Sequence, residues 1–104
     1  NNTILGLIGL AARARKVSFG ADSVELKKKK NKVYLIILAQ DSSSRTKEKF
    51  QKISENYKIP IIITQTIEDL SKAIGKSNKA ILGIEDINLA SEIQEINNGG
   101  DAIG

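Results

Sequence analysis

Residues 33–39 read VYLIILA, seven consecutive apolar residues that directly follow the basic run KKKKNK. Aliphatic and β-branched side chains without polar alternation are typical of a strand that is covered on both faces. Asp41 and three serines end the pattern. The stretch therefore predicts a central strand with helices on either side of it.

Segments on both sides of this strand continue the pattern. Strands are also predicted for IIIT at 61–64, which follows Pro60, for AILGI at 80–84 and, as a short extended piece, for 17–19. Apolar residues recur at helical spacing in the segments between them, which predicts helices at 3–14, 21–30, 44–57, 67–75 and 88–96. Strands that alternate with amphipathic helices predict an α/β fold, a three-layer α/β/α sandwich.

The length of 104 residues suits one domain that covers residues 1–104, with a frayed tail at about 97–104. Cysteine and histidine are both absent, which excludes disulfides and thiolate zinc sites and removes the commonest general base. The apolar runs are much shorter than the ~20 residues that span a bilayer. Composition therefore predicts a soluble cytoplasmic protein that does not enter a membrane, and it disfavours an enzyme.

Positive charge is concentrated near the start of the chain. Residues 1–32 carry a net charge of +6 and residues 33–80 carry +3, whereas residues 81–104 carry −5. Such a gradient favours a polyanionic partner, because a concentrated positive field attracts nucleic acid or an anionic surface.

The four lysines at 27–30 have two interpretations. Consecutive helical residues are rotated by about 100°, so the four side chains point in different directions and at most two of them face one ligand. Cations at a helix C-terminus are also favoured by the helix dipole, without any ligand. The run is therefore either a contact with a polyanion, made by at most two of the lysines, or a solvated helix end.

Gly20 opens the second predicted helix just after Arg13, Arg15 and Lys16. A helix N-terminus leaves amides unpaired and is suited to binding phosphate. The alternative is that Gly20 is an ordinary N-cap.

The segment at 9–41, GLAARARKVSFGADSVELKKKKNKVYLIILAQD, is followed by IEDLSKAIGK and AILGI. This order resembles the kink-turn RNA-binding superfamily of ribosomal proteins, the group of archaeal ribosomal protein seven-Ae and ribosomal protein thirty-e, and most of all its small bacterial members. The resemblance covers residues 3 to about 95. It implies a small mixed sheet of about four strands and a monomer that binds structured RNA, with ribosomal RNA as one candidate, without catalysis, cofactor, metal or small-molecule substrate.

The residues that read a kink-turn in that family have changed here. The family's Gly, Thr or Ser, Asn, Glu and Lys fall on Gly20, Ala21, Asp22, Ser23 and Leu26, so the glycine alone is kept. Asp offers acceptors where Asn offers a donor and an acceptor. The loop that packs on the extruded nucleotide falls on residues 76–79, where KSNK replaces an apolar stretch with a proline.

The resemblance implies an RNA face that joins the start of the second helix to this loop. Gly20, Ala21 and Ser23, together with the neighbouring Asp22, would allow the RNA to approach the backbone closely. Asn78 would form a hydrogen bond with a base or a sugar. The phosphates would be neutralised by four lysines, Lys16, Lys27, Lys76 and Lys79. Phosphate contacts of this kind set affinity more than sequence preference.

Two other functions remain open at this point. A protein-interaction module with the same fold would explain the lost kink-turn residues, and an accessory domain of an RNA-modifying enzyme is a third interpretation. The segment AQDSSS at 39–44 is interpreted as a cap for the third helix and not as a catalytic loop, and Asp86 is interpreted in the same way.

Overall fold

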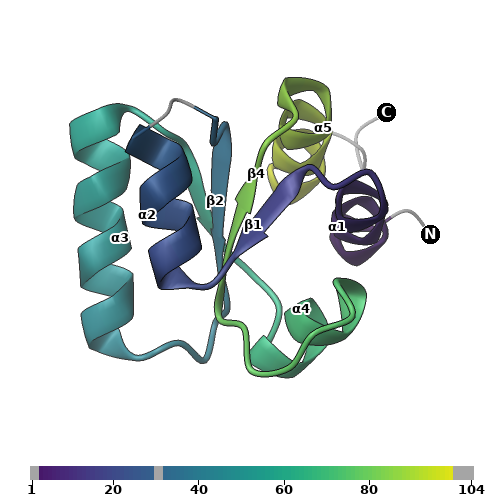
Figure 1. Cartoon of the computed structure of the whole chain (residues 1–104), viewed down its shortest axis with the longest axis horizontal. Coiled ribbons are helices and arrows are strands. Elements are labelled where there is room, and N and C mark those ends of the chain that lie inside the picture. The colour runs from purple at the N-terminus through teal and green to yellow at the C-terminus, as the bar shows by residue number, and fades with distance from the viewer. Residues whose placement is uncertain (1–2, 30–31, 100–104) are drawn as a thin grey trace.

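The computed structural model describes residues 3–29 and 32–99, and the side chains of residues 26–29 lie outside the described part. Helices and strands alternate along the chain (Figure 1). The elements are α1 (Ile4–Arg13), β1 (Val17–Phe19), α2 (Ala21–Lys29), β2 (Leu35–Leu38), α3 (Ser44–Tyr57), β3 (Ile61–Ile63), α4 (Ile67–Ala73), β4 (Ile81–Ile84) and α5 (Ile87–Asn97).

The four strands form one mixed sheet in the order β1-β4-β2-β3. Strands β2 and β3 are parallel, while β4 runs antiparallel to both β2 and β1. Helices α2 and α3 cover one face of the sheet, and α1, α4 and α5 lie on the other (Figure 1). The predicted α/β/α sandwich with a mixed sheet of about four strands is confirmed.

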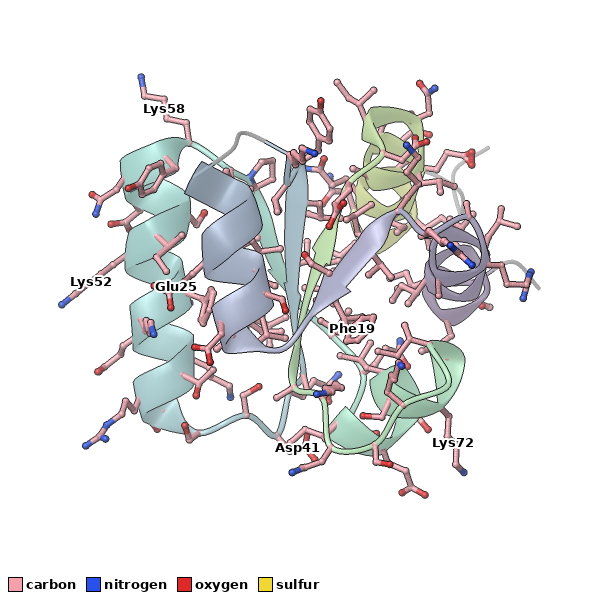
Figure 2. The ribbon with its side chains drawn as sticks, in the orientation of Figure 1. Phe19, Glu25, Asp41, Lys52, Lys58 and Lys72 are labelled. Atoms are coloured by element: carbon pink, nitrogen blue, oxygen red, sulfur yellow. The ribbon has the colours of Figure 1, made fainter. Side chains whose placement is uncertain are left out.

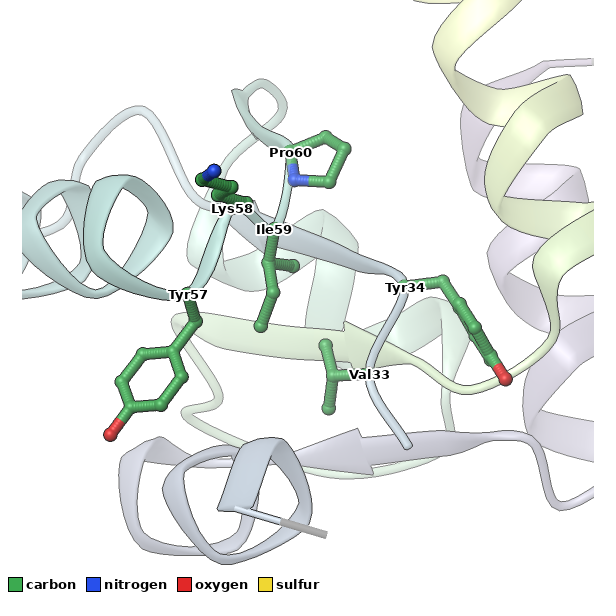
Figure 3. Close-up of a pocket in the computed structure, with 6 residues that line it drawn as sticks. All are labelled: Val33, Tyr34, Tyr57, Lys58, Ile59 and Pro60. Carbon is green, nitrogen blue, oxygen red and sulfur yellow. The ribbon is translucent and has the colours of Figure 1, made fainter. Parts of the chain in front are cut away.

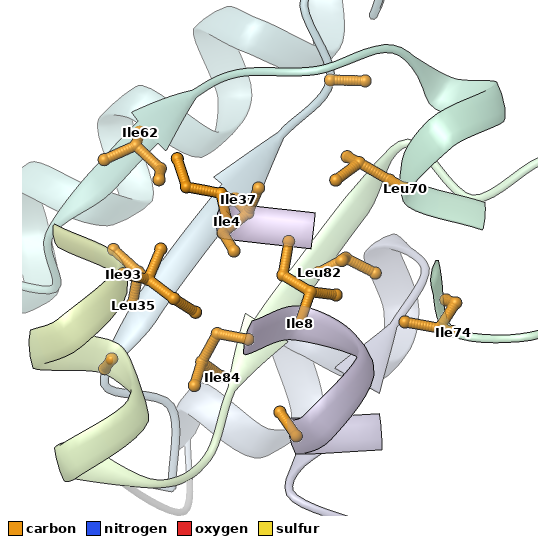
Figure 4. Packing of buried hydrophobic residues seen from close by; sticks show 13 residues of the cluster. Ile4, Ile8, Leu35, Ile37, Ile62, Leu70, Ile74, Leu82, Ile84 and Ile93 are labelled. Carbon is orange, nitrogen blue, oxygen red and sulfur yellow. The ribbon is translucent and has the colours of Figure 1, made fainter. Parts of the chain in front are cut away.

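Strand β2 divides the core into two layers. Leu35 and Ile37 pack into the cluster beneath α1, α4 and α5 (Figure 4). Ile36 and Leu38 point to the opposite face, where they pack with Phe50 of α3. Alternate residues of a strand face opposite sides of a sheet, and both sides are buried here. This explains why the sequence lacks polar alternation in β2.

Strand β3 departs from the prediction. The sequence predicted a buried strand, but Ile61 is half-buried and the side chain of Ile63 is 41% exposed. The reason is its position, because β3 is the last strand of the sheet. Tyr57, in the last turn of α3, is also exposed.

The helix caps agree with the sequence in most cases. The side chains of Thr3, Ser43 and Thr66 accept a backbone N–H at the starts of α1, α3 and α4. Asp86 caps α5 as expected. Asp41 does not cap α3, since its Oδ1 accepts the amide of Ile67 at 2.9 Å, at the start of α4.

Several boundaries differ from the prediction by a few residues. The central strand is Leu35–Leu38 and not residues 33–39, although Val33 and Ala39 are buried beside it. Helix α5 continues to Asn97, one residue beyond the predicted end, and its C-cap is Asn98; residues 100–104 of the predicted tail lie outside the described part. No helix within the described part has the length and apolar character that a membrane span needs.

Candidate nucleic-acid interface

The start of α2 lies against the start of β4. Gly20 has a φ of +91°, a conformation that glycine adopts without strain, and its amide donates to the carbonyl of Ile81 at 2.9 Å. Helix α2 begins at the next residue, and the carbonyl of Gly20 accepts the amide of Val24 at 3.1 Å. The loop that precedes β4 is therefore brought next to the first turn of α2.

Phe19 lies where the loop before β4 meets the start of α2. The Nζ atoms of Lys76 and Lys79 lie 5.1 Å and 5.9 Å from the centroid of its ring, within the range of a cation–π contact. A Cβ added at Gly20 would lie 3.9 Å from Lys79 Nζ. Figure 2 shows Phe19 next to the segment that joins α4 to β4. We call Phe19, Gly20, Lys76, Asn78 and Lys79 the Phe19 surface.

The loop at 76–79 is fixed by one buried side chain of α4. Ser71 Oγ accepts the amide of Lys79 at 2.8 Å and donates to the carbonyl of the same residue at 3.3 Å. The carbonyl of Ser71 accepts the amide of Lys76 at 2.9 Å. Asn78 has a φ of +57°, which Asn tolerates better than most residues. Both lysines are therefore held by ordered backbone.

The structure brings together most of the residues predicted for an RNA face. Asp22 and Ser23 are exposed in the first turn of α2, Ala21 is half-buried there, and Lys76 and Asn78 are exposed in the loop. Lys16 is separated from them, since it lies at the other end of β1, where its carbonyl accepts the amide of Glu85 at 2.7 Å. The side chains of Lys27 and Leu26 lie outside the described residues.

A hollow of about 430 Å³ borders the same loop. Ile67, Ser71 and Lys72 of α4 line one side, and residues 76–78 line the other. Asp41 and Glu68 also reach it. Two lysines, Lys72 and Lys76, and two carboxylates therefore line this hollow.

Sequence reasoning missed Phe19 and Ser71. Phe19 belongs to a chain with two phenylalanines and two tyrosines, and it directly precedes Gly20. An aromatic residue on a short strand next to a predicted anion site was a usable signal. Ser71 carried no such signal, because its partner Lys79 is eight residues away in a loop of unknown course.

The chemistry available at the Phe19 surface is anion binding and stacking. Two ammonium groups, the amides of the first turn of α2 and an aromatic ring meet at one place. Among the described residues, no cluster of three Asp or Glu side chains could hold a metal ion. The carboxylates of Asp41 and Asp86 accept backbone amides at the starts of α4 and α5.

Comparison with known proteins places the chain among RNA-binding relatives. The RNA-binding protein YlxQ of Bacillus subtilis (strain 168) is 32% identical over 87 residues, which cover 84% of this chain and 87% of the relative. The Enterococcus faecium protein of the same name is 30% identical over 95 residues, 91% of each chain.

Solved structures share the fold. A Bacillus halodurans protein of unknown function superposes with a TM-score of 0.89 at 30% identity, over 94% of this chain and 99% of the other. The 15.5kD RNA binding protein of Giardia lamblia has a TM-score of 0.74 at 20% identity, over 86% and 80%, a likeness of fold alone. Residues 2–94 also match the model of one protein family. The chain therefore belongs to the ribosomal protein L7Ae/L30e/S12e/Gadd45 family.

Proposed function

We propose that this protein binds structured RNA through the Phe19 surface and acts as a binding module without catalysis. The observation that carries the proposal is the convergence of Lys76 and Lys79 on Phe19, beside the open face of Gly20 and the start of α2. Two cations and a helix N-terminus at one place are suited to consecutive phosphates. The names of the two YlxQ relatives support RNA as the ligand.

The RNA that fits this surface is compact and sharply bent, as a kink-turn is. Such an RNA brings phosphates of two strands close together and extrudes a nucleotide, which the hollow beside residues 76–78 could receive. Recognition of the G·A base pairs of a kink-turn is weakened here, because Asp22 and Ser23 are exposed at the positions of the family's Asn and Glu. Affinity would then depend more on phosphate contacts than on base contacts.

A binding role without catalysis agrees with the chemistry of the side chains. The chain contains no histidine or cysteine, and the carboxylates of Asp41 and Asp86 have structural roles, since each accepts a backbone amide at the start of a helix. We further propose that the RNA is bound by a monomer, because the Phe19 surface is built from residues of one chain.

The experiment is a comparison of two RNAs by fluorescence anisotropy, a kink-turn hairpin and a plain duplex of equal length. We expect the hairpin to bind more tightly, and its binding constant to fall by about 0.7 to 0.9 log units per log unit of salt for each phosphate contacted. The double variant Lys76→Ala/Lys79→Ala should weaken binding. The control is Lys52→Ala/Lys58→Ala, which removes the same charge on and beside α3, where both side chains point to solvent (Figure 2).

Equal losses in both double variants would contradict the proposal, since the charge alone would then matter. Absence of binding to either RNA at micromolar protein would favour the remaining function, a protein-interaction module that kept the fold and lost its RNA site.

A further inference from the structure

A second basic pocket lies at the opposite end of β1 from the Phe19 surface. Arg15, Lys16, Lys32, Tyr34 and Glu85 line a pocket of about 440 Å³, which we call the Tyr34 pocket. Resting on the proposed function, we propose that this pocket binds one single-stranded nucleotide that flanks the structured RNA, with its base on the Tyr34 ring and its phosphate near Arg15 and Lys32.

Backbone hydrogen bonds assemble the pocket from three distant segments. The amide of Tyr34 donates to Ile84 at 2.8 Å, and the amide of Glu85 donates to Lys16 at 2.7 Å. Tyr34 is 40% exposed, and its side chain extends away from Tyr57 and Ile59 (Figure 3). An exposed ring held by the sheet offers a stacking platform for a base of any sequence.

The charge of the pocket favours a phosphate. Three cations, Arg15, Lys16 and Lys32, share the pocket with one carboxylate, Glu85. All three cations are exposed and can therefore meet a ligand without moving buried groups. The carboxylate reduces the net positive charge, so a single phosphate is a better match than a cluster of phosphates.

Arg15 stands where the backbone alone would favour glycine. Its φ is +59°, and the amides of Arg15 and Lys16 donate to Ala12 and Ala11 at 3.0 Å and 2.8 Å, the pattern that ends a helix with a left-handed residue. Glycine commonly fills that position, since other residues are strained there. A strained arginine that lines a basic pocket is a reason to look for function in its side chain.

A groove connects the pocket to the Phe19 surface. It has a volume of about 210 Å³, runs along the open edge of β1, and is lined by residues that include Arg15, Val17, Phe19 and Ser23. Gly20 lies four positions after Lys16 in the sequence, which is about 13 Å in an extended strand. A nucleic acid strand that leaves the Phe19 surface can follow this edge to Tyr34.

The test compares a blunt kink-turn hairpin with the same hairpin carrying a single-stranded tail of about six nucleotides, long enough to span the groove at 3.4 Å or more per nucleotide. Tails are placed on the 5′ or the 3′ strand in separate RNAs. We expect one of the two tails to tighten binding about fivefold or more, the effect of stacking one base. The quantity reported is the ratio of the dissociation constants of blunt and tailed hairpins.

Variants of pocket residues test whether the Tyr34 pocket causes this ratio of dissociation constants. Tyr34→Leu should bring the ratio close to one, whereas Tyr34→Phe, which keeps the ring, should preserve it. Arg15→Gly should lower the ratio without lowering the midpoint of thermal unfolding. Lys58→Gly is the matched control, because Lys58 also has a left-handed backbone (φ +55°) and loses one positive charge, but it lines the pocket of Figure 3 and not the Tyr34 pocket.

A ratio near one for the wild type with both tails would overturn the inference, and so would an equal reduction of the ratio by Arg15→Gly and Lys58→Gly. If the blunt hairpin does not bind, the proposed function fails while the pocket is still tested, by titrating a single-stranded RNA of about six nucleotides. Wild type binding that strand more tightly than Tyr34→Leu supports the pocket, and equal binding overturns it.

Discussion

An aromatic ring lies among positively charged side chains at each end of β1, but different interactions hold the residues in place at the two ends. At the Phe19 surface, the lysines come from a loop that the side chain of Ser71 holds, and their ammonium groups lie over the ring. At the Tyr34 pocket, backbone hydrogen bonds between strands hold the residues, and a carboxylate is included.

This difference separates two kinds of contact. The Phe19 surface has the helix N-terminus of α2 and no carboxylate among its five residues, so it is suited to a dense group of phosphates. The Tyr34 pocket has an exposed ring and a lower net charge, so it is suited to one nucleotide. Similar residue types therefore give different sites according to what holds them.

The largest expected effect is the loss of affinity for the blunt hairpin when positive charges are removed at the Phe19 surface. Lys76→Ala/Lys79→Ala is expected to cost about 3 kcal/mol or more in binding the blunt hairpin, since each charged contact contributes about 1.5 to 3 kcal/mol. Arg15→Ala/Lys16→Ala should cost much less on the same RNA. The slope of log binding constant against log salt should also fall by about 1.4 to 1.8 in the first variant alone. Similar slopes in both variants would mean that the two ends act as one diffuse field.

The second effect is a gain at the Phe19 end. Asp22→Asn/Ser23→Glu restores two family residues at exposed positions, and we expect it to raise the preference for a kink-turn over a duplex by about 1 to 3 kcal/mol. Ser91→Glu/Glu92→Gln on exposed positions of α5 leaves the net charge equally unchanged and serves as the control. Anisotropy titrations with both RNAs measure the preference. No gain in a folded variant would show that α2 docks differently.

A smaller effect is expected from removing the Ser71 hydroxyl, which holds the loop at 76–79 in place. Ser71→Ala leaves the amide of Lys79 without its partner and should lower the free energy of unfolding by about 1 to 2 kcal/mol, together with hairpin affinity. Ser18→Ala is the comparison, because Ser18 Oγ makes a weaker contact of 3.5 Å to the Gly83 carbonyl. Urea unfolding measures both. An equal or greater loss for Ser18→Ala would be evidence against the role given to Ser71.

The smallest effect belongs to the carboxylate of the Tyr34 pocket. Glu85→Gln removes a negative charge next to the proposed phosphate, and we expect about a twofold tighter binding of the tailed hairpin, within the range of exposed charge interactions. The blunt hairpin should respond less. A twofold gain for both hairpins would instead indicate a general effect of net charge.

Local features of the fold could be predicted from the sequence. The apolar run at 33–39 predicted a strand buried on both faces, and Asp86 was identified as a helix cap, because these features depend on neighbouring residues. The exposure of Ile63 could not be foreseen, since it depends on which strand ends the sheet.

The sequence predicted which segments form the candidate site, but it did not predict which side chains meet there. Gly20 and the loop at 76–79 were paired through the resemblance, and the structure does bring them together. Lys16 was grouped with them because it is close in sequence, yet an extended strand carries it to the other end of the edge. The Asp41 contact with Ile67 spans 26 residues and followed from no local pattern.

The pairing of β1 has a consequence for when the proposed RNA-binding edge can form. In the described sheet β1 is the end strand and pairs with β4, and Ser18 meets Gly83 across 65 residues of chain. At about 5 to 20 residues per second, a ribosome needs roughly 3 to 13 s to add that length. During this interval the basic N-terminal segment has been made, but the sheet against which it docks has not. The proposed RNA-binding edge therefore forms only after β4 has been synthesised, and a nascent chain that ends before β4 cannot display it.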